Sequence, residues 1–584
     1  MARFWLGLLI LLASATAPVA ASPADDFKAL LDRHWAWWLA QNPVAATRLG
    51  ERAHDDRLND LSLAGRAVAA RDAAGFRAEL ARIPRTGLSP DDRVSAAILD
   101  QLLARQVEAE RYPLLLFTNR EGFHTAFANL PESVPLFTAA DYRSYVARLE
   151  AFPAQVDQAI ETTRAAVKAG YALPCVVLDG FEAGIRRVAE PWPQSRFAAP
   201  FRTRPVGVPE AEWPALEARA RAAVEGGVNP AYQRFADYVA RDYLPACTKA
   251  FGASARPGGR DYYRFRAASE TTTDLTPDQI HDIGLKEVAR IRAEMEAVAK
   301  RAGFASREAY VEHLRTDPQY YARTPGELMR EVAYVTRLVD AWMPRLFGKL
   351  PRLPYTIQEI PAEIAPYTTT AYYRPGSATA GAAGVYFVNT SKLNERPLFE
   401  VPALSIHEAV PGHHHQIALA QELDLPAFRR HAAFFTGFVE GWGLYSERLG
   451  IEMGMYDTPA KDMGRLSYEM WRATRLVVDT GLHWKGWSRE RAIQYMLDNT
   501  ALSRANIEAE VNRYIAWPGQ ALAYKIGELK IRELRDAAEK ALGARFDIRA
   551  FHDRLLESGA LPLDLLEAKM RDWIATEAKK GQAA

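Results

Sequence analysis

One short segment, Ser405–Gln416, constrains this chain more than any other part of its sequence. It places His407-Glu408 and the run His413–His415 on either side of Pro411-Gly412, within apolar and helical surroundings. Proline at position 411 cannot donate a backbone hydrogen bond to the carbonyl of His407, and its ring crowds that turn. We therefore expect a helix that kinks or bulges here, with Gly412 allowing unusual backbone angles.

The histidines on the two sides of this break are candidate metal ligands. In the usual zinc-binding helix, two histidines stand at i and i+4, and a glutamate after the first acts as general base. Here Pro411 occupies the i+4 position. If Pro-Gly forms a two-residue bulge, His413 replaces the missing ligand of His407, and Glu408 keeps the role of base. His414 is the alternative ligand, because i+7 returns to the same face of an unbroken helix, although about 10.5 Å further along its axis. A polar turn with a chance run of histidines is the simplest alternative.

The segment Phe434–Glu447 supplies a third candidate ligand. Glu440 stands in an otherwise apolar run, where an unpaired carboxylate would be costly and a metal would stabilise it. Gly441 and Gly443 permit the close packing that a crowded site needs. Glu447 lies at i+7 on the same face and could orient a ligand histidine. The alternative for Glu440 is a salt bridge to an arginine in the core.

Together these side chains predict a Zn²⁺ site made by His407, His413 and Glu440, with water in the fourth position. The same ligand set also binds other divalent ions, such as manganese or cobalt. A structural zinc would instead be closed by a fourth protein ligand, for which His414 and Glu447 are candidates.

A second polar cluster lies in the segment Glu469–His483. Arg475, Asp479 and His483 follow one another at i, i+4 and i+8 and so line one face of a helix. One interpretation is a functional face, with His483 as a donor to the transition state and Arg472 or Arg475 as an anchor for a carboxylate. Asp479 is a further candidate to support or complete the metal site. A buried ladder of ion pairs is an equally good interpretation.

Two tyrosines complete the candidate site residues. Tyr524, in the segment Pro518–Tyr524, could stabilise an oxyanion through its hydroxyl. Tyr386 lies in Val385–Asn389, whose alternation and β-branched residues predict a strand shortly before the metal-binding helix. An extended peptide can pair with a sheet edge, so Tyr386 is a candidate substrate contact. A small structural hairpin is an equally good interpretation of this strand.

The rest of the sequence predicts a mainly α fold with a small β-sheet next to the metal helix. A well-marked helix begins at Thr276, with Pro277 in its first turn and Gln279 completing a capping box. Its buried stripe is expected at Ile280, Ile283, Val288, Ile291 and Met295.

The first 21 residues have the features of a cleaved secretory signal: a basic start, an apolar run and small residues at the cleavage point. The run is shorter than the roughly 20 residues of a membrane span, and no cysteine follows it as a lipid attachment point. We therefore expect an exported protein without stable membrane insertion, periplasmic if the source is a Gram-negative bacterium. Cys175 and Cys247, the only two cysteines, could pair in that oxidising setting. The net charge of +1 argues against a nucleic-acid partner.

These motifs resemble a bacterial family of largely uncharacterised helical proteins that carry H-E-x-x-P-G-H-H-x-Q. The family's later motifs E-G-W-x-x-Y-x-E, R-x-x-x-D-x-G-L-H and P-G-Q-A-x-x-Y-K correspond here to Glu440–Glu447, Arg475–His483 and Pro518–Lys525. The family is similar to helical zinc peptidases with two lobes around a long cleft, such as angiotensin-converting enzyme, neurolysin and carboxypeptidase Taq. The resemblance implies an N-terminal helical region, residues 22–270, that forms one cleft wall, and a metal-binding catalytic region, residues 271–584.

The function expected from the sequence is therefore that of an exported zinc metallopeptidase acting on a peptide substrate. Hydrolysis of a non-peptide amide or ester would use the same residues, and an exported binding protein with a structural metal is a third hypothesis. The substrate, its length and the oligomeric state are left open by the sequence.

Overall fold

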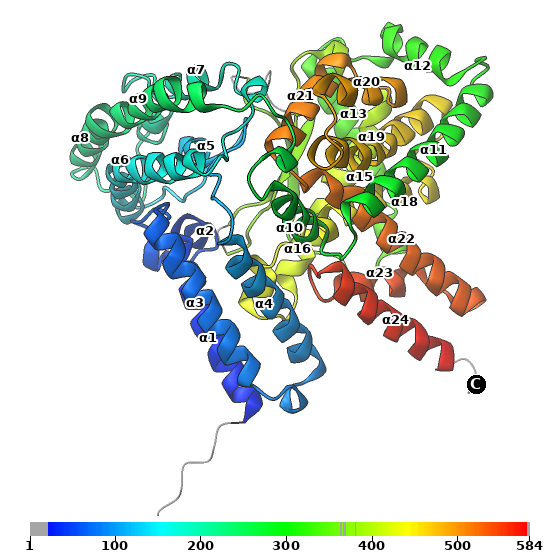
Figure 1. The fold of residues 1–584 in the computed structure, drawn as a ribbon, viewed down its shortest axis with the longest axis horizontal. Helices are drawn as coiled ribbons and strands as arrows, with labels where there is room; N and C mark the ends of the chain where they lie inside the picture. The colour runs from blue at the N-terminus through cyan, green and yellow to red at the C-terminus, as the bar shows by residue number, and fades with distance from the viewer. Residues whose placement is uncertain (1–21, 363–364, 366–368, 380, 581–584) are drawn as a thin grey trace, which may run out of the picture.

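The computed structural model describes residues 22–362, 365, 369–379 and 381–580 (Figure 1). The expected signal segment, residues 1–21, lies outside the described residues. Helices dominate the fold and one small three-stranded sheet accompanies them, so the prediction of a mainly α fold is confirmed. None of the helices in the described part of the chain combines the length and the apolar character that crossing a bilayer requires.

The N-terminal region is an array of helices that begins with α1 (Pro23–Gln41), capped by Ser22. Helix α3 packs against both α1 and α4, and α6 packs against α8 and α9 (Figure 1). Cys175 and Cys247, which follow α6 and α9 respectively, form a disulfide with their Cα atoms 5.0 Å apart. The further helices of this region are α2 (Pro43–Arg48), α3 (Leu63–Arg82), α4 (Pro90–Ala109), α5 (Phe123–Ala128), α6 (Ala139–Lys168), α7 (Phe181–Arg186), α8 (Trp213–Ala223) and α9 (Asn229–Tyr238).

Helix α10 (Gly259–Thr271) packs against α18 and α22, and so joins the N-terminal region to the C-terminal one. In the C-terminal region α11 lies along α19, and α18 lies along α22. Its helices are α11 (Pro277–Arg301), α12 (Arg307–Thr316), α13 (Pro325–Asp340), α14 (Met343–Leu346), α15 (Val401–Glu408), α16 (His413–Glu422), α17 (Ala427–His431), α18 (Thr436–Glu452), α19 (Pro459–His483), α20 (Arg489–Asn499), α21 (Arg504–Ala516), α22 (Ala523–Leu542), α23 (Ile548–Leu556) and α24 (Leu563–Lys580).

Helix α11 forms where its sequence predicts it. The Thr276 hydroxyl accepts from the backbone N–H of Gln279, and the Gln279 side chain accepts in return from the backbone N–H of Thr276. The predicted stripe faces the core, except that Ile283 is only half-buried. This match is expected, because a capping box and a 3.6-residue apolar period are both local signals.

The sheet consists of β1 (Tyr355–Glu359), β2 (Ala371–Arg374) and β3 (Gly384–Val388), in the order β1-β3-β2. The predicted strand is therefore present, one residue earlier than expected. However, β3 pairs in parallel with β1 and antiparallel with β2, so it has no free edge to which a peptide could add. Tyr386 in this central strand is fully buried, with its hydroxyl 3.4 Å from that of Ser405, which corrects its expected role as a substrate contact.

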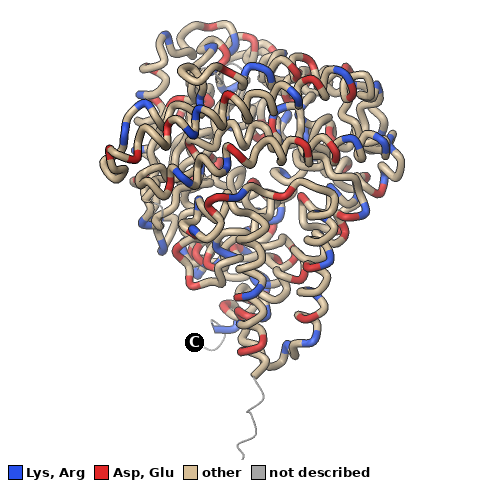
Figure 2. Tube along the Cα trace, turned by 90° about the vertical axis from the view of Figure 1, so that its left-hand side faces the viewer, with Lys and Arg blue, Asp and Glu red and all other residues tan. Residues whose placement is uncertain are grey.

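Charged residues of both signs are interspersed along the chain in the view of Figure 2. No single-sign region dominates that view, in keeping with the net charge of +1.

Candidate metal centre

The helix break predicted at Pro411-Gly412 is present. Helix α15 ends at Glu408 and α16 begins at His413, and the four residues between them form a turn. In this turn the N–H of Gly412 donates to the carbonyl of Ile406 (3.0 Å). A Cβ atom at position 412 would overlap the carbonyl oxygen of His407. Close approach of two backbone segments, rather than a left-handed conformation, is therefore what requires glycine here.

The turn brings His407 and His413 to the same side as Glu440 of α18. The Nε2 atoms of His407 and His413 lie 3.5 and 3.4 Å from Oε2 of Glu440, and one potential ligand atom from each residue falls within 4.8 Å of the others. Zinc bonds of about 2.0–2.1 Å place two tetrahedral ligands roughly 3.3–3.4 Å apart. The separations from Glu440 to each histidine therefore suit one shared ion.

The hydrogen bonds around these groups leave the right atoms free. Oε2 of Glu440 is buried and has no hydrogen-bond partner among the described residues. The Nδ1–H of His407 donates to Oε1 of Glu447 (2.8 Å), so its Nε2 lone pair is available to a cation. A buried carboxylate oxygen without a donor is costly, and a divalent ion would remove that cost. The residues present therefore fit a zinc ion.

In the metal-free protein, Glu440 and His407 each stabilise the charged form of the other. Burial disfavours the Glu440 carboxylate, but the neighbouring imidazoles of His413 and His407 outweigh it and hold the pKa of Glu440 well below its usual range. Burial likewise opposes protonation of His407, but the nearby carboxylate of Glu440 and the hydrogen-bonded carboxylate of Glu447 raise its pKa to about 9. A cation at this position takes over the role that the protonated imidazole plays for these carboxylates.

Glu447 and Arg472 hold the candidate ligand His407 in place from the side of its Nδ1 atom. Oε1 of Glu447 accepts from His407 and also lies 3.2 Å from Nη2 of Arg472 on α19. The Arg472 guanidinium packs over the rings of Tyr468 and Trp471, with its central carbon 4.6 and 4.7 Å from their centroids. The expected orienting role of Glu447 thus matches its position. Arg472 faces Glu447, which corrects its expected role as a substrate anchor.

Two glycines allow α18 to approach its neighbours at this site. A Cβ atom at Gly443 would lie 2.7 Å from the ring of His407, and one at Gly441 would lie 2.5 Å from the backbone of Gly527 on α22. The close packing predicted from these glycines is confirmed.

Glu408 follows His407 directly at the end of α15. Its side chain is almost fully buried, and no hydrogen bond to it is found in the described ranges. A carboxylate with unused acceptor capacity beside a ligand histidine has the position that a general base needs.

The side chain of His414 is directed toward the small sheet and away from Glu440. Its Nδ1 lies 2.9 Å from the hydroxyl of Tyr373, and its ring packs against Tyr355, so it faces the sheet. Burial lowers its pKa to about 4. Of the two rival ligands, the structure brings His413 to Glu440 and leaves His414 with the strands.

At the end of α19, His483 and Asp479 of the second cluster contact backbone groups rather than one another. His483 is fully buried: its Nδ1 accepts from the backbone N–H of Ala253 (2.9 Å) and its Nε2 lies 2.9 Å from the carbonyl of Tyr514. Burial lowers its pKa to about 3. Both ring nitrogens are engaged with the backbone, so His483 has no free donor for a transition state. This corrects the expected catalytic role.

Asp479 also forms hydrogen bonds within the protein, including one with a backbone N–H. Its Oδ1 accepts from the Tyr263 hydroxyl (2.6 Å) and from the N–H of Gly519 (3.1 Å). Burial raises the pKa of Asp479 to about 7. Asp479 thus anchors the turn before Tyr524 and is not among the grouped metal-ligating residues, which corrects its candidacy as a ligand.

Arg475 and Tyr524 stack on each other in the same cluster. The Arg475 guanidinium lies 4.4 Å from the ring centroids of both Tyr524 and Trp471, and its Nε donates to the hydroxyl of Tyr514. Arg475 is buried and its Nη2 also pairs with Glu510 (3.3 Å), while its Nη1 has no hydrogen-bond partner among the described residues, so its role as a substrate anchor stays a prediction. The Tyr524 hydroxyl accepts from Arg513 (3.3 Å), so its own proton remains free for donation. Sequence reasoning missed Arg513, because nothing local links it to Tyr524.

Comparisons with known proteins agree with the family that the motifs indicate. The model of a bacterial protein family of unknown function, DUF885, matches residues 43–570. The chain belongs to this family.

Two solved structures are similar over nearly the whole chain. A presumed lipoprotein from Colwellia psychrerythraea is 28% identical, with a TM-score of 0.87 over 95% of this chain and 100% of its own. A presumed lipoprotein of unknown function from Shewanella oneidensis is 20% identical, with a TM-score of 0.67 over 94% of this chain and 100% of its own, and shows the shared fold alone. No curated protein matches the sequence.

Proposed function

We propose that this DUF885 protein is an exported zinc-dependent peptidase. The observation that carries the proposal is the convergence of His407, His413 and the unpartnered Oε2 of Glu440, with Glu408 beside them. Three protein ligands with one open position are the usual arrangement of a catalytic zinc, whereas a structural zinc has four.

Zinc held by His407, His413 and Glu440 would supply a Lewis acid and make a water molecule acidic near neutral pH. Glu408 then accepts the proton of the attacking water on its free carboxylate and passes it to the leaving amine. Glu447 fixes the ring and tautomer of His407 through the Nδ1 hydrogen bond, and Arg472 holds Glu447 in turn. Tyr524, which accepts from Arg513, is our candidate to donate to the oxyanion of the substrate.

A structural metal is the weaker hypothesis. Its fourth ligand would have to be His414 or Glu447. His414 is hydrogen-bonded to Tyr373, and Glu447 lies on the Nδ1 side of the His407 ring, away from the Nε2 that faces Glu440, although its Oε2 has no partner among the described residues. A peptide substrate is favoured over another amide or ester by the resemblance to helical zinc peptidases. The same catalytic groups would serve either substrate, so the experiment below includes both.

Export is supported by two observations. The disulfide between Cys175 and Cys247 suits an oxidising compartment. The similar proteins from Colwellia psychrerythraea and Shewanella oneidensis are described as presumed lipoproteins, a class of exported proteins. We therefore propose an exported location, periplasmic in a Gram-negative source.

The test is to incubate zinc-loaded protein with a mixed peptide library and to identify the products by mass spectrometry. Glu408→Gln should keep its zinc and lose hydrolysis by at least a hundredfold, as expected for loss of a general base. Glu490→Gln, at an exposed position on α20, is the matched control and should cleave like the wild type. Cleavage that survives Glu408→Gln would refute the mechanism. Hydrolysis of simple esters or amides by the wild type, with no peptide cleaved, would replace the peptidase by the second hypothesis.

A further inference from the structure

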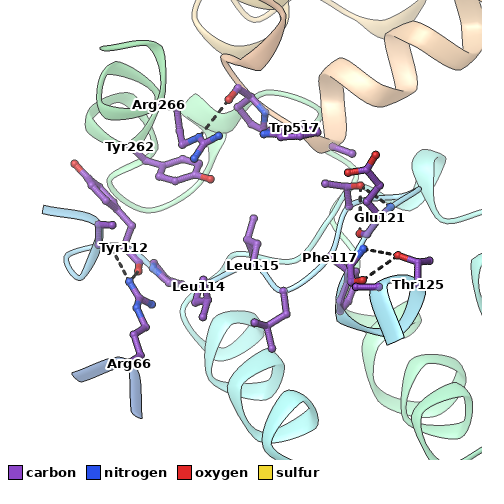
Figure 3. A pocket seen from close by; sticks show the side chains of 18 of the residues that line it. Arg66, Tyr112, Leu114, Leu115, Phe117, Glu121, Thr125, Tyr262, Arg266 and Trp517 are labelled. Carbon is purple, nitrogen blue, oxygen red and sulfur yellow. Dashed lines mark hydrogen bonds between the residues drawn. The ribbon is translucent and has the colours of Figure 1, made fainter. Parts of the chain in front are cut away.

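A cavity lies away from His407, His413 and Glu440, none of which lines it. It measures about 640 Å³, within the ~300–1,000 Å³ range of ligand pockets. Its walls come from the segment after α4, from α10 and from the turn before η13 (Gln520–Leu522) (Figure 3). Aromatic and aliphatic side chains dominate the lining: Tyr112, Leu114, Leu115, Tyr262, Phe265 and Trp517.

One wall is a strand-like segment with a free edge. Phe117 forms an isolated antiparallel bridge with Gly122, flanked by bonds that use the carbonyl of Leu116 and the N–H of Thr118. Successive residues of an extended chain direct their backbone groups to opposite edges. The N–H and carbonyl groups of Leu115 and Phe117 therefore face away from Gly122, and they have no hydrogen-bond partner in the described part of the chain.

The two arginines at the cavity are already paired within the protein, and Glu121 is the remaining charged residue of the lining. Arg66 binds the carbonyls of Ala109 and Tyr112 and pairs with Glu110 (2.8 Å). Arg266 pairs with Glu270 of the same helix. Figure 3 shows Leu115 directed into the middle of the pocket, toward the space beside Tyr262 and Trp517. This interior suits uncharged, apolar side chains next to a backbone that offers hydrogen bonds.

Two walls of the cavity are linked by hydrogen bonds to elements that carry candidate site residues. Glu270, the partner of Arg266, accepts from the hydroxyl of Thr436 (2.8 Å), the first residue of α18, which carries Glu440 one turn later. At another wall, Pro518 precedes the turn whose Gly519 is held by Asp479 and which leads to Tyr524. A ligand in the cavity therefore contacts the supports of the candidate catalytic groups.

We propose that this cavity binds an extended, apolar stretch of the peptide substrate by strand addition to Leu115 and Phe117. Main-chain hydrogen bonds to this edge supply affinity, and the aromatic walls select uncharged apolar side chains. In naming a peptide substrate, the inference rests on the proposed function. It adds the substrate class: peptides with apolar residues at a distance from the bond that is cut.

The test measures binding without turnover. Zinc-loaded Glu408→Gln protein is titrated into fluorescein-labelled Leu-Ala-Phe-Leu-Ala-amide and followed by fluorescence anisotropy. In this background Leu115→Pro removes one N–H from the free edge but keeps an apolar side chain, and should weaken binding about three- to tenfold. Leu115→Asp places a charge in the apolar space and should weaken binding at least tenfold. Val206→Pro is the matched control: it removes the N–H of a fully exposed apolar residue outside the cavity lining, and affinity should stay within twofold. Thermal unfolding of each variant establishes that it is folded.

The outcomes separate the two proposals. Binding with the predicted order of variants, but no cleavage by the wild type, would support the cavity and refute the peptidase. Cleavage of the same peptide with no effect of either Leu115 substitution would support the peptidase and overturn the cavity proposal. Binding of dodecanoate that Leu115→Pro leaves unchanged, with no binding of the peptide, would also overturn it, since the cavity would then take acyl chains.

Discussion

The clusters around His407 and around His483 contain the same residue types, yet they use their hydrogen-bonding capacity in opposite ways. At His407, buried polar atoms from three helices point at one another, and Oε2 of Glu440 is left without a donor. At His483, both ring nitrogens and the neighbouring carboxylate of Asp479 are engaged with backbone or tyrosine groups. A candidate site differs from a structural network in having buried polar atoms that face one point and lack hydrogen-bond partners. Residue type and spacing do not distinguish the two.

The second cluster positions Tyr524, the proposed oxyanion donor. Through Asp479 it fixes Gly519, and through Arg475 it packs against Tyr524. The residues around His407 would therefore bind a metal ion, whereas those around His483 hold the neighbouring backbone and Tyr524 in place. The following substitutions test that contrast.

The largest effect is expected for His413→Ala, with His414→Ala as its matched neighbour. Loss of a ligand should weaken zinc binding by more than a hundredfold, beyond the ten- to hundredfold typical of groups that only support a ligand. His414 faces Tyr373 and the sheet, so its substitution should retain one zinc per chain. Metal content after dialysis, by plasma mass spectrometry, measures both. The reverse result would make His414 the ligand.

His483→Ala should act on stability. It leaves the N–H of Ala253 and the carbonyl of Tyr514 unpaired in a buried position, which we expect to cost about 3 kcal/mol of the free energy of unfolding. Denaturant titration measures that loss, and the folded variant should retain zinc and most of its turnover. A fall of ~10²–10³ in turnover at unchanged stability, the signature of a lost oxyanion donor, would move His483 into the active site.

Glu447→Gln should weaken the metal centre without removing a ligand. The amide no longer offers a charged acceptor to His407, so zinc affinity should fall ten- to hundredfold. Glu452→Gln, on the same helix but paired with Arg535, is the control and should bind zinc as the wild type does. Competition with a fluorescent zinc chelator gives both affinities. Equal affinities would exclude support of His407 by Glu447.

The smallest effect concerns pH and Asp479. Burial raises its folded pKa to about 7, above the unfolded value near 3.9, so the folded state holds the proton more tightly. Its contribution to stability is therefore lost as the pH rises through the folded pKa. Relative to Asp479→Asn, the wild type should lose about 1 kcal/mol of unfolding free energy between pH 6 and pH 7. Urea titrations at the two pH values measure this difference. Parallel pH profiles would show that the carboxylate is ionised throughout.

Local signals account for what the sequence predicts correctly. The capping box of α11, the helix break at Pro411-Gly412 and the shared face of Glu440 and Glu447 each depend on a few neighbouring residues. The choice of His413 follows from the same local geometry, once the break is absorbed as a bulge.

Long-range contacts account for what the sequence does not predict. The Arg472–Glu447 pair joins two helices, and the backbone partners of His483 come from positions 253 and 514. The place of β3 between two other strands depends on a pairing with β1 that no local pattern encodes. An arginine or histidine on a buried helix face looks the same in sequence whether its partner is a substrate or the protein itself.

The most direct test of the central claim is anomalous X-ray diffraction at the zinc absorption edge from crystals of the zinc-loaded wild type. The account predicts one strong peak bonded to His407, His413 and Glu440, about 2.0–2.1 Å from the imidazole nitrogens, with a solvent-accessible fourth position. No peak at these residues, or a peak closed by a fourth protein ligand, would contradict it.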